Sequence, residues 1–210
     1  MSTMSTDDDV AGLLALVRGF AAAAQFPVLL RLLADGRPVE RERIAAATGR
    51  SAAEVDELLA GPPTPQLDDR GHLIGLGLSL VPTPHRFVVA DRVLYTWCAT
   101  DALMFPAIIG QPASVESVCP VTRRPIRVEV LPDRLGPSSP DEVVVSRDLP
   151  ATAIADLRTA GCAHGRFFAA ATAAARWQDA HPHGRVRSLA EEFAHGQDLV
   201  DAAGWRSRAR

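Results

Sequence analysis

The sequence of 210 residues contains no lysine and no asparagine, so all 22 of its basic residues are arginines. The absence of lysine excludes mechanisms that need a Schiff-base lysine or the lysine of a phosphate-binding loop. Cysteine is scarce too: Cys98, Cys119 and Cys162 are too few, and odd in number, for the disulfide framework of a secreted protein of this length. We therefore expect free thiols and a cytoplasmic location.

The chain also lacks an excess of charge of either sign and lacks long apolar runs. Its net charge of -3 is not that of a nucleic-acid scaffold. The longest uncharged stretch near the N-terminus, residues 19–30, has 12 residues, whereas a membrane helix needs about 20. Acidic residues at 7–9 stand where a secretory leader would be basic. With 47% hydrophobic residues, the chain can bury a full core, and we expect a soluble protein.

The first 81 residues predict a helical extension followed by a winged helix. Helical periodicity covers 10–24, and Pro27 reads as a break or as the opening of a second helix through 33. Two short helices follow at 40–48 and 51–60, the latter with a capping box formed by Ser51 and Glu54. A hairpin turn after 66–69 and a strand at 73–80 complete the unit, with Gly75 and Gly77 as bulge or close-approach positions.

The second half predicts mixed helices and strands. We expect strands at 85–89, 114–118, 126–130 and 142–146, a loop at 137–140, and helices at 92–105, 169–180 and 188–203. Pro106 should end the first of these helices, and Ser188 with Glu191 should cap the last. The predicted fold class is α+β, with a winged-helix-like helical part packed on a mixed α+β core. The predicted domains are an N-terminal extension (1–25), a winged-helix-like domain (26–81) and a catalytic core (82–210).

The predicted helix at 92–105 carries the first candidate for chemistry. Leu94, Trp97, Cys98, Asp101 and Phe105 would share one face of it. A carboxyl on an apolar face is costly unless it is paired or protonated, and desolvation raises its pKa toward neutrality, as a proton donor requires. In the alternative interpretation, Asp101 caps the helix or pairs with an arginine, and Cys98 is a small apolar core residue.

The second candidate is Cys162, which stands in a turn of small residues. Its thiol could be exposed there, and His164 could favour the thiolate. A buried structural cysteine is the alternative. Cys119 precedes Pro120 at the end of a predicted strand, which indicates a structural role.

Several other patterns do not form a site. The spacing of the three cysteines matches no zinc finger, because C-x-x-C is absent. His181-Pro182-His183 is more typical of a solvated turn than of a ligand set. Gly75-Leu76-Gly77 does not lead from a strand into a helix, so it is not a dinucleotide fingerprint. From the residues alone, a pair of soft ligands and a buried acid remain.

The stretch from Leu94 to Gly110 resembles the signature of organomercurial lyases (alkylmercury lyases), a Tyr-x-Trp-Cys-x-x-Asp segment that runs into Phe-Pro-Ala. The resemblance extends over roughly 27–197. Further segments fall in family order: Gly36-Arg37-Pro38-Val39, Gly75-Leu76-Gly77-Leu78, Cys119, Cys162-Ala163-His164 with Phe167-Phe168, and Glu192-Phe193 with Gly196-Gln197. The family's fold is a winged-helix-like part packed on an α+β core, as the residues predict independently.

The resemblance implies that Cys98 and Cys162 are the mercury-binding thiols, that Asp101 handles the proton at the same site, and that Cys119 is structural. It implies protonolytic cleavage of a carbon–mercury bond to a hydrocarbon and Hg(II), as part of mercury detoxification. No cofactor is expected, only external thiols or a mercuric reductase that removes Hg(II), with no nucleic-acid or membrane partner. Two departures from the family pattern are Ala163, where several members have a second cysteine, and Arg166, where His-x-His would place a histidine.

The competing interpretation is a winged-helix metal sensor that uses thiols and binds DNA. Residues 31–80 contain six arginines and eight acids, a net charge of -2. The candidate recognition helix, 51–60, contains Glu54, Asp56 and Glu57 and no basic residue. This is the wrong sign of charge for contact with a phosphate backbone, so the sequence favours the enzyme.

Overall fold

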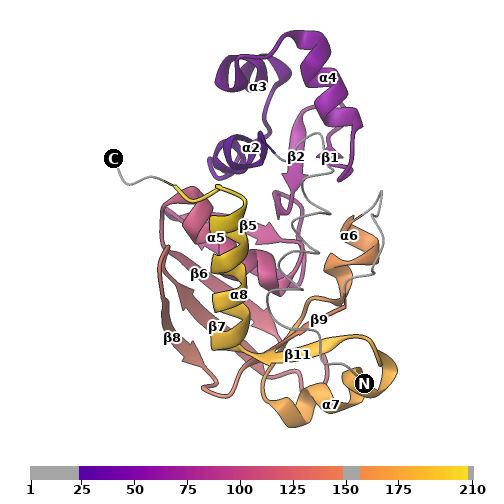
Figure 1. The fold of residues 1–210 in the computed structure, drawn as a ribbon, viewed down its shortest axis with the longest axis vertical. Helices are drawn as coiled ribbons and strands as arrows, with labels where there is room; N and C mark the ends of the chain where they lie inside the picture. Colours follow the sequence, from indigo (N-terminus) through magenta and orange to yellow (C-terminus); the bar gives the residue numbers. More distant parts are fainter. Residues whose placement is uncertain (1–23, 149–156, 208–210) are drawn as a thin grey trace.

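A computed structural model describes residues 24–148 and 157–207 of the chain (Figure 1). Three N-terminal helices stand at one end of the molecule, above a large sheet that is covered by two helices packed against each other. The predicted α+β fold class is confirmed. The helix predicted at 10–24 lies almost wholly outside the described residues.

The N-terminal helices are α2 (Phe26–Leu33), α3 (Arg41–Thr48) and α4 (Ala52–Ala60). The capping box of α4 is confirmed: the Glu54 backbone N–H donates to Ser51 Oγ (3.4 Å) and the Ser51 N–H donates to Glu54 Oε2 (2.8 Å). Gly49, with φ of +69°, ends α3 in the left-handed conformation that glycine adopts without strain. Local sequence signals therefore place the helix-turn-helix correctly.

The wing, which we define as residues 66–80, differs from the prediction. The strand expected at 73–80 is two strands, β2 (Leu73–Leu76) and β3 (Leu78–Ser79), which pair antiparallel with each other, and β1 (Gln66–Leu67) pairs with β2. Gly77 lies between them with φ of +76°, and this conformation reverses the chain. The close-approach role expected for Gly77 is confirmed, because a Cβ there would lie 2.7 Å from Phe105 Cζ.

The prediction of a helix at 92–105 is wrong. Strand β5 (Arg92–Thr96) pairs antiparallel with β4 (His85–Val89), and helix α5 (Ala99–Ile109) starts only after it. Val93, Tyr95 and Thr96 are residue types that favour a strand. Over so short a stretch, the spacing of apolar residues fits the helical period as well as the strand period. Pro106 lies inside α5 and does not end it. Every residue of α5 except Asp101 is buried, and this packing outweighs the cost of an interior proline, about 3 kcal/mol.

One eight-stranded sheet runs through the molecule in the order β1-β2-β3-β5-β4-β6-β7-β8. The wing belongs to this sheet through the pairing of β3 with β5. The predicted hairpin is confirmed as β6 (Ala113–Val118) and β7 (Pro125–Val130). The loop predicted at 137–140 is wrong, because β8 (Leu135–Ser139) occupies most of it. As an edge strand, β8 tolerates Pro137, which has no N–H to donate.

A small sheet, in the order β10-β9-β11, lies beside the large one and consists of β10 (Phe167–Phe168), β9 (Val144–Arg147) and β11 (Arg185–Ser188). Between β9 and β10 lie α6 (Leu157–Ala160) and the 3-10 helix η1 (Cys162–His164). The predicted closing helices are confirmed as α7 (Ala171–Ala180) and α8 (Leu189–Ala202), and α8 packs along α5 (Figure 1). None of the described helices is both long and apolar enough to cross a membrane.

Candidate active site

Cys98 and Asp101 lie at the beginning of α5. Cys98 is the N-cap residue, and its Sγ accepts a hydrogen bond from the Asp101 backbone N–H at 3.4 Å. The shared helical face predicted for them is wrong, because Leu94 and Trp97 precede the helix. The N-cap geometry brings the thiol and the carboxyl together instead, since the N-cap side chain folds over the first turn.

Gly165 brings the segment of Cys162 against this turn. Its carbonyl accepts the Ala99 N–H (3.0 Å), and a Cβ on Gly165 would lie 2.7 Å from Cys98 Cβ. Only glycine permits this approach. As a result Cys98 Sγ, a carboxylate oxygen of Asp101 and Cys162 Sγ all lie within 4.8 Å of one another. The structure thus gathers the three residues that the sequence singled out.

Burial and contacts within the group shift the pKa values of Asp101 and Cys98. Cys98 and Cys162 are each only 7% exposed, and Asp101 Oδ2 is buried without a hydrogen-bond partner. Burial raises the pKa of Asp101 from 3.8 to about 7, although hydrogen bonds from Cys98 act in the opposite direction. The hydrogen bond with Cys162, burial and the neighbouring Asp101 raise the pKa of Cys98 well above its ordinary value. Within the described residues no arginine pairs with Asp101, so the part of the alternative that gives it such a partner finds no support there.

The wing forms one wall of the site. A Cβ on Gly77 would lie 3.8 Å from Asp101 Oδ2, and the Gly77 carbonyl accepts the Trp97 N–H at 2.8 Å. The Trp97 indole N–H in turn donates to Gln66 Oε1 (2.9 Å) on β1. The N-terminal part therefore helps to keep water from the carboxyl of Asp101.

A buried polar network holds the other side of the α5 turn. The Thr100 hydroxyl donates to Glu192 Oε1 at 2.6 Å, and Arg187 Nη1 donates to Glu192 Oε2 at 3.1 Å. Glu192 has no solvent exposure. The sequence did not predict this network, because an acidic residue in the first turn of a capped helix is typical of a solvated surface.

His85 and Arg166 lie near the segment of Gly165 and Cys98, and neither was predicted as functional. His85 is 1% exposed, and its Nδ1 lies 3.1 Å from Ser117 Oγ. Burial and the nearby charge of Arg166 lower the pKa of His85 to about 3, so the imidazole is neutral at pH 7. From the sequence, Arg166 was notable only because it stands where the family pattern has a histidine.

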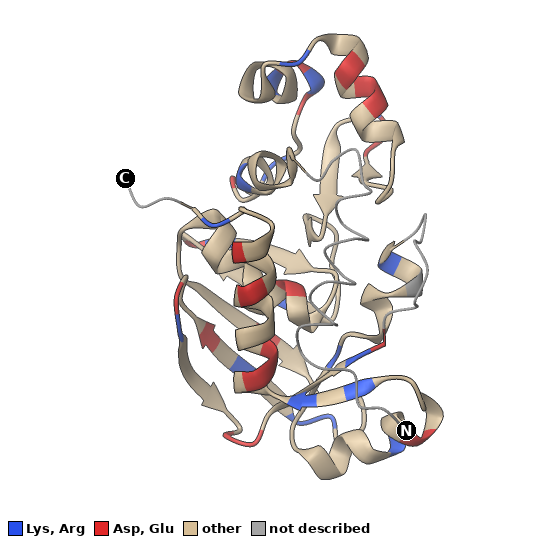
Figure 2. Cartoon of the chain, in the orientation of Figure 1, with Lys and Arg blue, Asp and Glu red and all other residues tan. Residues whose placement is uncertain are grey.

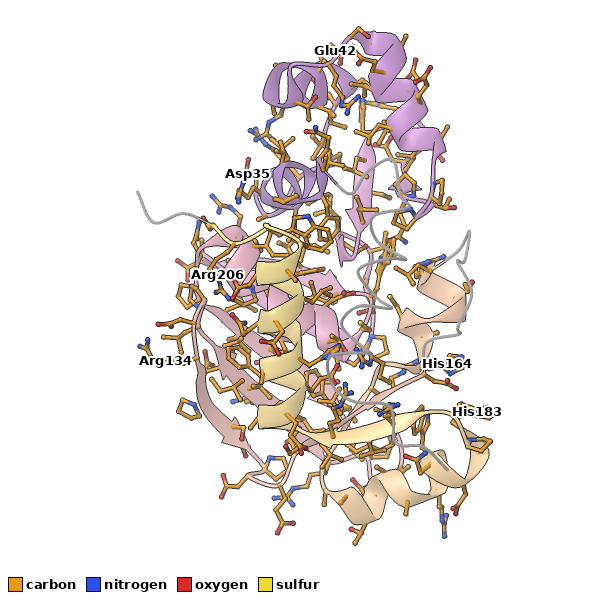
Figure 3. All side chains as sticks on the ribbon, in the orientation of Figure 1. Asp35, Glu42, Arg134, His164, His183 and Arg206 are labelled. Atoms are coloured by element: carbon orange, nitrogen blue, oxygen red, sulfur yellow. The ribbon has the colours of Figure 1, made fainter. Side chains whose placement is uncertain are left out.

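The exposed thiol predicted for Cys162 is wrong, because the residue is buried. The ring of His164 packs 5.2 Å from that of His181, and His164 lies at the outer side of the molecule (Figure 3). His181 itself stacks on Trp177 at 4.3 Å. Within the described part of the chain, Cys98, Asp101 and Cys162 are the one group of three potential metal ligands.

Cys119 does not belong to this group. It is fully buried, and its Sγ accepts the Thr122 N–H at 3.5 Å. Burial raises the pKa of Cys119, but hydrogen bonds from Thr122, Ala169 and Val121 outweigh burial and leave the pKa below its ordinary value. The sulfur serves as a hydrogen-bond acceptor that holds the β6–β7 turn.

Two buried thiols and one carboxyl with a buried oxygen suit a particular chemistry. Thiolates are the ligands that soft metals prefer. A carboxyl with a pKa near 7 can both accept and donate a proton at neutral pH. The arrangement can therefore bind a soft metal between two sulfurs and move a proton beside it.

Comparison with known proteins agrees with this chemistry. Residues 78–201 match the family model described as "Alkylmercury lyase", and residues 17–77 match the model "Helix-turn-helix domain of alkylmercury lyase". An alkylmercury lyase of Streptomyces lividans is 45% identical over 174 residues, 83% of this chain and 80% of that protein. The one of Pseudomonas putida is 46% identical over 160 residues, 76% of this chain and 75% of that protein.

A solved structure has the same fold. The crystal structure of the mercury-bound form of MerB2 has a TM-score of 0.77 and covers 92% of this chain and 98% of its own. At 22% identity, this likeness concerns the fold alone.

Proposed function

The chain belongs to the alkylmercury lyase family, and on that premise we propose how its two thiols and one carboxyl divide the reaction between them. The protein is an organomercurial lyase. It acts on organomercury compounds, cleaves their carbon–mercury bond by protonolysis, and releases a hydrocarbon and Hg(II). The observation that supports our assignment of roles is the approach of Cys98 Sγ, Cys162 Sγ and the Asp101 carboxylate to within 4.8 Å of one another.

Capture of the substrate is the first step. An organomercury cation arrives bound to an external thiolate, and one protein thiol replaces that thiolate on mercury. Cys98 and Asp101 hold this intermediate at the beginning of α5. The proton that leaves the protein thiol goes to the departing thiolate, so the charge in the pocket does not change.

Attack by the second thiol is the step that breaks the bond. The Asp101 carboxylate takes the proton of this thiol, and the sulfur binds to mercury. Electron density moves onto the carbon, and the carboxyl delivers its proton there. The carbon leaves as a hydrocarbon, the carboxylate is regenerated, and Hg(II) stays bound to the two sulfurs. The pKa of Asp101, raised to about 7 by burial, suits both halves of this transfer.

The reaction needs no organic cofactor and no resident metal, because the chain's own groups supply ligands and proton. We propose that external thiols or a mercuric reductase then remove Hg(II), and that the enzyme works in the cytoplasm, where thiols are reduced. We keep the division into an extension (1–25), a winged-helix-like domain (26–81) and a catalytic core (82–210). In this division Asp101 and both thiols lie in the core, and the wing closes the site.

The helix-turn-helix has no DNA-binding role in this proposal. Helix α4, in the position of a recognition helix, carries Glu54, Asp56 and Glu57 and no basic residue (Figure 2). Asp56 pairs with Arg41 at 2.8 Å, so one of the few arginines nearby is already neutralised. A phosphate backbone would meet repulsion here.

Hydrocarbon release tests the proposal. The purified, reduced protein is incubated with phenylmercury and excess mercaptoethanol, and benzene in the headspace is measured by gas chromatography. We expect release well above that of a blank containing the thiol alone. Release no greater than the blank would refute the enzyme, and salt-sensitive binding of any DNA duplex would support the sensor instead.

A further inference from the structure

Arg166 is a charged side chain beside the thiols that the reaction above does not use. Its Nε donates to the Ala163 carbonyl at 3.0 Å, and its backbone N–H donates to Ser146 Oγ at 3.2 Å. The residue is half-buried. In the described part of the chain, no acidic side chain forms an ion pair with it.

The position of Arg166 follows from its two neighbours along the chain. Gly165 touches Cys98, since a Cβ there would lie 3.5 Å from Cys98 Sγ. Ala163, whose carbonyl holds the guanidinium, directly follows Cys162. The guanidinium is thus tied to the segment 162–165, which begins at one thiol, Cys162, and ends at Gly165 in contact with the other, Cys98. Burial lowers the pKa of Arg166, and the neighbouring Cys98 acts in the opposite direction, as expected for a charge close to that thiol.

A half-buried cation is costly where no anion faces it, so a guanidinium with no acidic partner among the described residues favours an anion beside it. Its Nε is occupied, and the terminal nitrogens remain to form the planar fork that matches a carboxylate. An anion at this place would stand next to mercury bound at Cys98. Such an anion would have to be carried by a group attached to the mercury.

We propose that Arg166 binds a carboxylate on a group attached to mercury, which is either the organic group itself or the thiol that delivers it. The inference rests on the proposed function and adds a substrate class to it. Arg166 is then a substrate-binding residue that favours anionic organomercury species over neutral ones of the same size.

Two matched comparisons test this. The first compares para-mercuribenzoate with phenylmercury, both delivered with mercaptoethanol, and so places the carboxylate on the organic group. The second delivers phenylmercury with mercaptopropionate or with mercaptoethanol, and so places the carboxylate on the thiol. In each pair the ratio of kcat/KM, carboxylate over neutral, is measured by hydrocarbon release.

We expect the parent enzyme to prefer the carboxylate partner in at least one pair, and Arg166→Gln to lower that ratio about tenfold, mainly through KM. Arg166→Lys keeps the charge without the fork and should lower the ratio about threefold. Arg158→Gln, at an exposed arginine of α6, removes the same charge nearby and should leave the ratio as it is.

A lower ratio in the first pair alone assigns the aryl carboxylate, and a lower ratio in the second pair alone assigns the carrier thiol. No preference in the parent, or equal losses on charged and neutral partners, would overturn the proposal. If Arg166→Gln does not fold, an unchanged ratio in Arg166→Lys overturns it instead. Release from phenylmercury by the parent judges the proposed function separately, because that substrate carries no carboxylate.

Discussion

Cys98 and Cys119 stand in turns that are locally alike. In each turn the sulfur accepts the backbone N–H of the residue three positions later, at 3.4 Å for Cys98 and 3.5 Å for Cys119. Both residues are buried. Yet the pKa of Cys98 is raised well above its ordinary value, whereas that of Cys119 is lowered.

The difference comes from the groups that face each sulfur, some of them local and some distant in the sequence. Cys98 faces a second thiol and a carboxyl, both of which oppose a negative charge on it. Cys119 faces hydrogen-bond donors, the Thr122 hydroxyl and several backbone N–H groups, which favour one. A turn therefore does not make a thiol catalytic. At Cys98 the largest effect comes from Cys162, which lies in the distant loop at 162–165.

Removing either thiol of the pair tests this comparison most severely. Cys98→Ser and Cys162→Ser should each abolish hydrocarbon release, because a hydroxyl is too hard and too weakly acidic to replace a thiolate on mercury. Headspace chromatography measures the release, and circular dichroism checks the fold. An active Cys162→Ser enzyme would show that another group supplies the second ligand.

Asp101→Asn should separate proton transfer from metal binding. The variant keeps the shape of the side chain but loses the acid, so single-turnover release should fall by about 10²- to 10⁴-fold. Both thiols remain, and Hg(II) should bind as it does in the parent. Release near the parental rate would mean that the proton comes from a thiol or from solvent.

The same carboxyl should make stability depend on pH. The folded protein keeps the Asp101 proton up to a pKa of about 7, whereas the unfolded chain loses it near 3.8, so the folded state binds more protons between these values. The free energy of unfolding should therefore fall as pH rises from about 4 to 7, by up to about 4 kcal/mol. Urea titrations of the parent and of Asp101→Asn measure this contribution. An identical pH dependence in both would contradict it.

The Thr100 hydroxyl should matter for rate more than for substrate binding. Thr100→Val keeps the volume but removes the bond to Glu192, which leaves the first turn of α5 less firmly oriented. We expect kcat to fall about tenfold with little change in KM, and Thr100→Ser to restore it. Thr48→Val, which removes a hydroxyl bonded to its own helix at the Ile44 carbonyl, is the control. A lower melting temperature with normal kcat would reduce Thr100 to a structural role.

Cys119→Ala should have the smallest effect on activity. It removes an acceptor of the Thr122 N–H and of further hydrogen bonds in the turn, so the free energy of unfolding should fall by about 1 kcal/mol while release per folded molecule stays the same. Thermal melting and headspace chromatography on one preparation decide this. Inactivity without loss of stability would mean that the contrast between the two turns is false.

Features that depend on neighbouring residues could be predicted from the sequence. Ser51 with Glu54, and Ser188 with Glu191, predict the beginnings of α4 and α8, because a capping box is a local hydrogen-bond pattern. The family resemblance named all three residues of the candidate site, Cys98 and Asp101 in one segment and Cys162 in another. Their approach to one another could not be derived from spacing, because it depends on the contact of Gly165 with Cys98.

Other errors arose where local preference and tertiary packing disagree. Residues 92–96 fit a helical period as well as a strand period, and only the pairing with β4 decides between them. Glu192 lies in the first turn of a capped helix, where exposure is the ordinary outcome, yet Arg187 and Thr100 make its burial possible. Such compensation between distant residues leaves no periodic signal.

The pairing of β3 with β5 makes the environment of Asp101 depend on the N-terminal part of the chain. An enzyme shortened to residues 82–210 would keep both thiols and Asp101 but would lose Gly77 and Gln66, and water would reach the carboxyl. Its acidity would return to that of an ordinary aspartate, permanently ionised at neutral pH. The shortened protein would bind mercury through its thiols but would not release a hydrocarbon. The winged-helix part, a type of module that binds DNA in other proteins, would here keep water away from the carboxyl that holds the proton.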